Sequence, residues 1–179
     1  GTQVTSVEET GNGGLFLIEA NTEEYAYSDT RVIPGGGYLH SPYGAHVTAN
    51  AASLVYFIPT EKDNTYKVAW LNNGHYINDM ITHSRWAWLQ WTDKEYEAAE
   101  ITFTPSDEAE GDFCLTNINK EDSCERIIYF DAIGKAFYCQ YDYFEELSSP
   151  YKTNFTIWKA NVNANGMKFM LEEAVNEAK

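Results

Sequence analysis

Side chains that could bind a sugar are concentrated between residues 70 and 91. Three of the five tryptophans lie in the stretch RWAWLQWT, which covers residues 85–92. A pyranose offers an apolar C–H face and a rim of hydroxyls, so its site needs an exposed aromatic plane beside amide and carboxylate groups. Both kinds of group occur here, and the predicted carbohydrate-binding residues are Trp86, Trp88, Gln90, Asn72, Asn78 and Asp79.

Alternation along a strand predicts which of the clustered tryptophans face solvent. If residues 85–92 form one strand, successive side chains lie on opposite faces. The predicted inward set is Ala87, Leu89 and Trp91. The predicted outward set is Trp86, Trp88 and Gln90. Tryptophan is commonly mostly buried, so coverage of the outward pair by the neighbouring segment 79–84 remains the alternative.

A second aromatic stretch, FYCQYDYFEELSSPY, covers residues 137–151. As a strand it would carry aromatic rings on both faces. An exposed tyrosine patch beside Glu145 and Glu146 would suit a partner protein or a sugar. The plainer interpretation is an inserted loop that folds back on the domain.

The sequence carries no pattern typical of catalysis. Adjacent acids such as Glu145 and Glu146 face opposite ways in a strand and are usually solvated in a loop. The four histidines, at positions 40, 46, 75 and 83, do not have the spacing of a metal site. The run PGGG at 34–37 is a turn signal, and a phosphate-binding loop would need a helix after it. We therefore expect no catalytic residues, no metal and no cofactor.

Composition limits the partners of the chain and the environment it suits. The 179 residues carry a formal net charge of −15, which opposes binding to polyanions such as nucleic acid or an anionic membrane. The apolar runs are only a few residues long, so we expect no membrane insertion. The three cysteines permit one disulfide, which would most plausibly involve Cys124 in a polar loop. Cys114 and Cys139 alternate with apolar residues and are expected to be buried thiols.

Short β-type runs, separated by turn residues, recur about every ten residues and predict an all-β sandwich or barrel. Three segments share one pattern: a strand centred on a phenylalanine, a polar turn and a second apolar strand. The phenylalanines are Phe57, Phe103 and Phe155, spaced 46 and 52 residues apart. The second strands contain residues 66–68, 113–115 and 169–171.

The repeats divide the chain into three units of about fifty residues and about four short strands each. A hairpin motif with a central tyrosine recurs at 37–40, 75–78 and 128–131. The expected units are approximately 15–64, 65–111 and 112–171, within one domain at 15–175. A polar lead at 1–14 precedes the domain and a polar tail at 172–179 follows it. Residues 167–171 are expected to form the last strand, beside 15–18, where the barrel closes.

Three four-stranded units with these phenylalanine-centred ends and hairpins resemble a β-trefoil, and in particular the ricin B-type lectin domains. That resemblance implies six strands closed into a barrel, three capping hairpins and a shallow sugar pocket on each unit. The Gln-x-Trp signature of the family does not occur, because Gln90 and Trp91 are adjacent. The resemblance implies a non-catalytic carbohydrate-binding module with a glycan or polysaccharide partner. It also implies a secreted, periplasmic or cell-surface location, alone or within a larger glycan-processing protein.

Two other functions remain open at the level of sequence. Protease inhibitors of the Kunitz soybean type are also trefoils of similar length and are often acidic, and they bind another protein. They usually contain two disulfides, which three cysteines do not favour. A structural spacer domain without a ligand is the third possibility.

Overall fold

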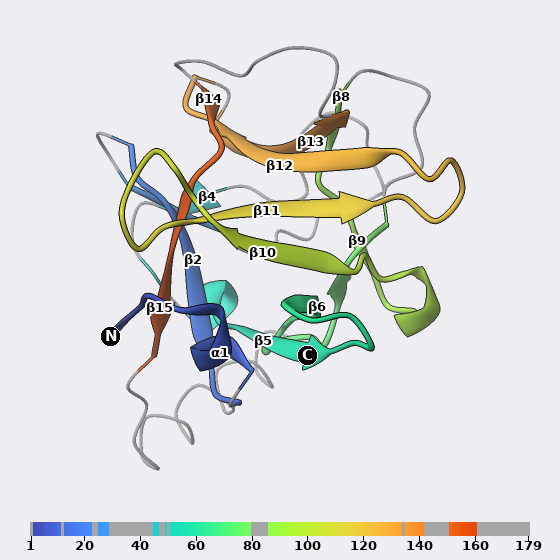
Figure 1. Cartoon of the computed structure of the whole chain (residues 1–179), viewed down its shortest axis with the longest axis horizontal. Helices are drawn as coiled ribbons and strands as arrows, with labels where there is room; N and C mark the ends of the chain where they lie inside the picture. The colour runs from blue at the N-terminus through green and yellow to red at the C-terminus, as the bar shows by residue number, and fades with distance from the viewer. Residues whose placement is uncertain are drawn as a thin grey trace.

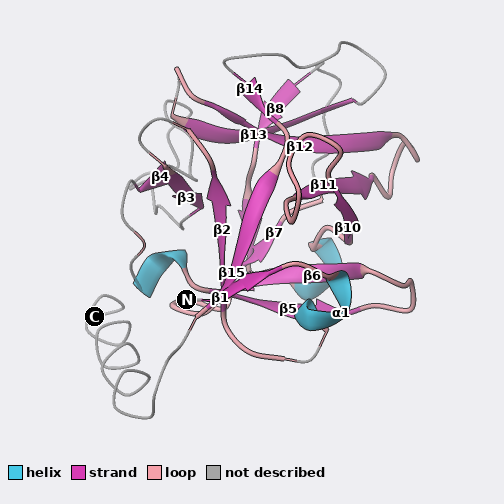
Figure 2. Ribbon diagram, turned by 60° about the vertical axis from the view of Figure 1, so that its left-hand side comes forward, coloured by secondary structure: helices cyan, strands magenta, loops and turns pink. Residues whose placement is uncertain are grey.

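The computed structural model describes residues 2–11, 13–22, 25–28, 45–46, 49, 51–79, 86–133, 135–141 and 151–160. Within these ranges the chain is almost entirely β-structure, as predicted (Figure 2). The helical segments there are single turns, namely α1 (Val7–Thr10), η2 (Ala51–Ser53) and η3 (Glu95–Glu97). No helix in the described part of the chain is long and apolar enough to cross a membrane.

Six strands form a closed antiparallel barrel (Figure 1). They are β2 (Phe16–Ala20), β5 (Val55–Pro59), β6 (Thr65–Trp70), β10 (Ile101–Pro105), β11 (Phe113–Ile118) and β15 (Phe155–Lys159). Each strand pairs with the next in this order, and β15 returns to pair with β2. Closure leaves these strands without a free edge on the ring, which removes a common route to aggregation.

Long and short pairings alternate around the barrel. The pairs β5–β6, β10–β11 and β15–β2 each match five residues in register. The pairs β2–β5, β6–β10 and β11–β15 match only one or two. The barrel therefore has an approximate three-fold pattern, although the residues at equivalent positions differ.

A two-stranded hairpin lies between the two barrel strands of each third of the chain. The first pairs β3 (Ala26–Ser28) with β4 (Ala45–His46). The second pairs β7 (Tyr76–Ile77) with β9 (Trp91–Thr92). The third pairs β12 (Glu125–Asp131) with β13 (Ala136–Tyr141). The hairpin motifs expected at 75–78 and 128–131 fall on β7 and β12, whereas residues 37–40 lie outside the described ranges.

Residues 85–92 do not form one strand, contrary to the prediction. Trp86–Trp88 form β8, which pairs with β13 of the third hairpin. After Leu89 and Gln90 the chain returns to the second hairpin, where Trp91 starts β9. The prediction failed because alternation was extended through a break in the strand that apolar periodicity does not mark.

The barrel closes one segment earlier than the sequence indicated. We expected residues 167–171 beside the first barrel strand, but β15 occupies that position, with Ile157 opposite Ile18. Residues 167–171 lie outside the described ranges. Two further strands extend the sheet, since β1 (Thr2–Val4) pairs with β15 and β14 (Tyr151–Lys152) pairs with β12.

Aromatic rings from several barrel strands meet in the core. Phe16 stacks on Phe57 with ring centroids 4.6 Å apart, and Phe57 meets Phe103 edge-on at 5.0 Å. Phe113 and Phe155 face each other in register and are fully buried. The three phenylalanines that mark the repeats are thus core residues. Burial of each such side chain contributes roughly 1.5–3 kcal/mol to folding.

The N-terminal segment packs against one end of this barrel. Val4 of β1 and Val7 of α1 are buried in the core cluster. The Glu9 carboxylate accepts hydrogen bonds from the backbone N–H groups of Thr5 and Ser6, each at 3.1 Å. These bonds, that from Thr5 first, lower the pKa of Glu9 and tie down the start of α1. Figures 1 and 2 both place α1 near β5 and β6, at the opposite end of the molecule from β12 and β13.

All three cysteines are free thiols. Cys139 is buried, as predicted, whereas Cys114 and Cys124 are half-buried. The structure therefore contains neither the single disulfide that the sequence permits nor the two bridges usual in Kunitz soybean-type inhibitors.

Cys139 should resist alkylation in the folded protein. Burial raises the pKa of its thiol to about 12, so the reactive thiolate is scarce at neutral or mildly alkaline pH. We expect brief iodoacetamide treatment, read by peptide mass spectrometry, to leave Cys139 unmodified until denaturant is added. Alkylation of native Cys139 as fast as that of Cys124 would contradict its burial.

Candidate functional site

The second hairpin brings several of the predicted polar residues together. Ile77 of β7 lies opposite Trp91 of β9, and the backbone N–H of Asn78 donates to the carbonyl of Gln90 at 2.8 Å. Asn78 is half-buried and Gln90 is exposed. Neither side-chain amide has a hydrogen bond to the described parts of the chain. Both amides therefore lack a partner within the described parts of the chain, on the same hairpin as Trp91.

His75 and Trp91 form a stacked pair of rings on this hairpin. Their centroids are 4.0 Å apart and their planes differ by 14°. Both residues are half-buried, and Trp91 also packs against the core cluster. The pair presents an aromatic surface that is only partly covered by protein, which suits the C–H face of a sugar.

The turn between β6 and β7 sets the position of His75. The backbone N–H of Gly74 donates to the carbonyl of Trp70 at 2.8 Å, and the N–H of Trp70 donates to the carbonyl of His75 at 2.9 Å. Gly74 has a φ of 70°, a left-handed conformation that glycine adopts without strain. The Asn73 side chain accepts from the His75 N–H at 2.9 Å. Asn72 lies half-buried in the same turn, three residues before His75.

The imidazole of His75 is held in a desolvated setting. Burial lowers its pKa, and the nearby charge of Asp93 opposes that shift without cancelling it. The buried Nδ1 atom has no hydrogen-bond partner among the described residues. At neutral pH the ring is therefore uncharged, and an uncharged ring stacks on the Trp91 indole.

The lowered pKa of His75 predicts that the protein loses stability in mild acid. Below the unfolded pKa of 6.5, the unfolded chain binds the proton more readily than the folded protein does. The stability that the neutral His75 contributes to the folded protein is fully present above pH 6.5 and is lost as the pH falls from there through the folded pKa. We expect the Tm of the wild type to fall more than that of His75→Gln between about pH 8 and about pH 5. Parallel Tm profiles for the two proteins would contradict this.

Asp79, the remaining predicted polar residue, lies inside the fold. Its carboxylate is 6% exposed and accepts hydrogen bonds from the side chains of Asn117 and Asn119, at 3.1 and 3.3 Å, and from the backbone N–H of Lys120, at 2.8 Å. Its own N–H donates to the carbonyl of Glu97 at 2.8 Å. Asp79 thus joins the end of the second hairpin to the β11–β12 turn.

The backbone of Trp86–Trp88 lies beside β13, with Trp88 opposite Tyr138 and Trp86 opposite Gln140. The side chains of Trp86 and Trp88 lie outside what the structure describes. The predicted set therefore divides: Asn72, Asn78 and Gln90 belong to the second hairpin and its entry turn, whereas the strand of Trp86 and Trp88 joins the third hairpin.

The second aromatic stretch begins as a paired strand, where the sequence had favoured an inserted loop. Residues up to Tyr141 belong to β13, while 142–150 lie outside the described ranges. Tyr138 stacks on Tyr129 at 5.4 Å, and Tyr151 meets Tyr129 edge-on at 5.5 Å. These rings join β12, β13 and β14, and Tyr151 is exposed.

Sequence reasoning missed the stacked pair of His75 and Trp91. It assigned Trp91 to the core because Trp91 alternated with Trp88 in an assumed continuous strand. The one signal that favoured the pair was the occurrence of His75 and Trp91 within the same repeat unit, which does not by itself predict contact.

Neither a metal-binding cluster nor a known relative identifies the function of this hairpin. Within the described residues, no group of three or more histidine, cysteine, aspartate or glutamate side chains could hold a metal ion. No model of a known protein family matches the chain, and a search of curated proteins finds no match either.

Proposed function

We propose that the protein is a non-catalytic carbohydrate-binding module of β-trefoil fold. The trefoil assignment is supported by the six-stranded barrel and by the order barrel strand, hairpin, barrel strand, which occurs three times. The binding assignment is carried by one observation: His75 and Trp91 form a stacked, half-buried pair of rings on a hairpin whose Gln90 and Asn78 amides have no hydrogen bond within the described chain.

The chemistry of this site matches a neutral sugar. A stacked ring pair can cover the C–H face of a pyranose, and each primary amide can donate to one hydroxyl and accept from another. The imidazole of His75 is uncharged, so a neutral ligand does not have to cover a buried charge. In this proposal the ligand is a glycan or polysaccharide, and the protein acts outside the cytoplasm or at the cell surface. Asp79 supports the hairpin and does not contact the ligand.

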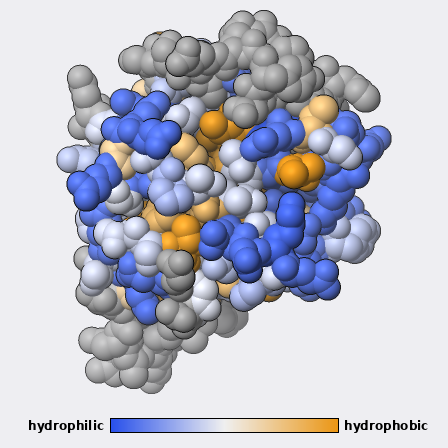
Figure 3. Space-filling view, viewed as in Figure 1, coloured by the Kyte–Doolittle hydropathy of each residue, from blue (hydrophilic) through white to orange (hydrophobic). Residues whose placement is uncertain are grey.

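One face of the molecule is mostly polar. Figure 3 shows mostly hydrophilic residues there, with the hydrophobic ones in small separate patches among the described atoms.

Affinity electrophoresis through gels that contain polysaccharides tests the proposal. We expect at least one neutral polysaccharide to retard the wild type, and Trp91→Ala and Gln90→Ala to lose most of that retardation. Loss of one aromatic stacking contact, worth about 0.5–1.5 kcal/mol, weakens binding by about 2- to 10-fold. Gln90 is exposed and has no side-chain bond to the described chain, so its replacement should leave folding intact.

Trp158→Phe is the matched control. Trp158 is also a half-buried tryptophan, but it lies on β15, where its indole N–H donates to Glu19 at 3.3 Å. Its variant should be retarded like the wild type. Equal retardation of the wild type, Trp91→Ala and Gln90→Ala would place sugar binding elsewhere and refute this site.

A further inference from the structure

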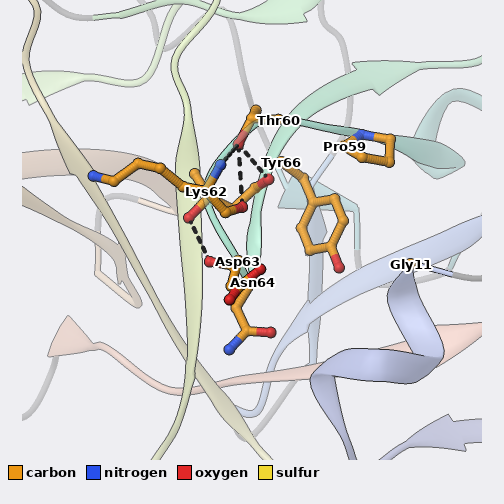
Figure 4. Close-up of a pocket in the computed structure, with 8 residues that line it drawn as sticks. Gly11, Pro59, Thr60, Lys62, Asp63, Asn64 and Tyr66 are labelled. Carbon is orange, nitrogen blue, oxygen red and sulfur yellow. Dashed lines mark hydrogen bonds between the residues drawn. The ribbon is translucent and has the colours of Figure 1, made fainter.

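A recess of about 530 Å³ opens between the turn that joins β5 to β6 and the end of α1 (Figure 4). Gly11 lines one side, and residues 59–60 and 62–66 line the other. Sites for small molecules commonly have volumes of about 300–1,000 Å³. The recess is therefore large enough for one or two sugar rings, and none of the predicted sugar-binding residues contributes to it.

The backbone of the β5–β6 turn satisfies its own polar groups. The Thr60 hydroxyl donates to the carbonyl of Thr65 at 2.9 Å, and the Thr65 hydroxyl donates to the carbonyl of Asp63 at 3.0 Å. Asn64 has a φ of 57°, which asparagine tolerates better than most residues. The side chains of Asp63 and Asn64 are exposed and have no hydrogen bond to the described residues. These bonds hold the turn in one conformation, while the carboxylate of Asp63 and the amide of Asn64 remain available.

Tyr66 adds a buried ring whose polar end reaches the recess. The residue is 7% exposed, and its ring packs near Phe57 at 6.0 Å and Phe103 at 5.7 Å. Its hydroxyl has no hydrogen bond within the described chain, and it is not among the buried polar atoms that lack a partner, so it is open to solvent at the recess. In Figure 4 the Tyr66 ring extends toward the side where Gly11 lies, and Lys62 extends the opposite way.

We propose that this recess is a second binding site for a neutral pyranose. The Asp63 carboxylate would accept from sugar hydroxyls, the Asn64 amide would both donate and accept, and the Tyr66 hydroxyl would exchange water for a sugar hydroxyl. Glu61, Lys62 and Asp63 give the turn one net negative charge, and together with the net charge of −15 on the chain this opposes an anionic sugar.

The recess and the hairpin site are separate. Tyr66 lies near the start of β6, and His75 lies beside Trp70 at its end, four residues away, so the two sites are roughly 13 Å apart along the strand. The recess shares the ligand class of the proposed function but none of its residues. Either site can therefore fail without the other.

Amide and side-chain NMR spectra of the labelled full chain test the recess. The probes are the methyl pyranosides of glucose, galactose, mannose and N-acetylglucosamine, at up to about 50 mM to cover a millimolar Kd. We expect at least one probe to cause saturable shifts at residues 60–66 and Gly11. Tyr66→Phe keeps the buried ring and should weaken this binding about 5-fold, as should Asp63→Asn.

Asp107→Asn is the control, because Asp107 is an exposed acid in the matching β10–β11 turn. It should leave the affinity unchanged. Saturable shifts that Tyr66→Phe and Asp63→Asn do not weaken would overturn the proposal, as would no saturable shift at residues 60–66 with any probe. Shifts confined to Trp91 and Gln90 would refute the recess and support the hairpin site. Shifts confined to the recess would support the recess and count against the hairpin site.

Discussion

We expect the replacement of Phe103 with alanine to lower the free energy of unfolding by about 3–5 kcal/mol, the usual range for a large ring removed from a packed core. Phe103 is 1% exposed and touches rings from both neighbouring strands of the barrel. It meets Phe57 at 5.0 Å and Tyr66 at 5.7 Å, both edge-on, and lies 6.4 Å from Phe113. Its loss would leave a cavity that a closed barrel cannot easily fill by collapse.

Urea denaturation followed by tryptophan fluorescence measures this effect. Tyr96→Ala is the control, because Tyr96 is an aromatic residue that is 72% exposed on η3, and it should change the stability by less than about 0.5 kcal/mol. A loss below about 1 kcal/mol for Phe103→Ala would contradict the packing of the core described here.

Replacing Asp79 with alanine should destabilise the protein by about 3 kcal/mol, since each buried donor left without an acceptor costs about 1–3 kcal/mol and water replaces part of the loss. The donors concerned are the Asn117 and Asn119 amides and the Lys120 N–H. Asp79→Asn keeps one acceptor oxygen in the same place and should cost less than Asp79→Ala.

Hydrogen exchange gives this prediction a local readout. The Lys120 N–H donates directly to the Asp79 carboxylate, so its protection should fall in Asp79→Ala. Protection of core amides in β5 should change only with global stability. Asp107→Ala removes an exposed acid and should leave both stability and exchange unaltered. Equal stability of Asp79→Ala and the wild type would refute the structural role of this carboxylate.

The sequence contained enough information for the architecture because the core repeats. Phe57, Phe103 and Phe155 lie on the barrel strands β5, β10 and β15. These strands pair with β6, β11 and β2, each over five residues. The pattern is visible because a strand with one buried face must alternate. The closing strand was misplaced because 155–159 and 167–171 are both apolar runs, and only the observed register distinguishes them.

The candidate site was less predictable because it depends on how two segments cross. Trp86–Trp88 leave the second hairpin and add to β13, a long-range pairing that local periodicity does not encode. The break at Leu89 and Gln90 then brings Trp91 onto His75. Asp79 has the residue type of a sugar ligand, yet its neighbours in space, Asn117 and Asn119, are about forty residues away in sequence. Residue type directed the prediction to residues 70–91, and tertiary contacts determine where each of these residues lies.

A glycan array probed with the intact wild-type protein tests the central claim most directly. We expect reproducible binding to a related group of neutral glycans, and competition by the free sugar that these glycans share. Trp91→Ala, checked to be folded by its unfolding transition, should lose that binding, whereas Trp158→Phe should keep it. Absence of binding to every neutral glycan on the array and to soluble polysaccharides would contradict the assignment of this protein as a carbohydrate-binding module.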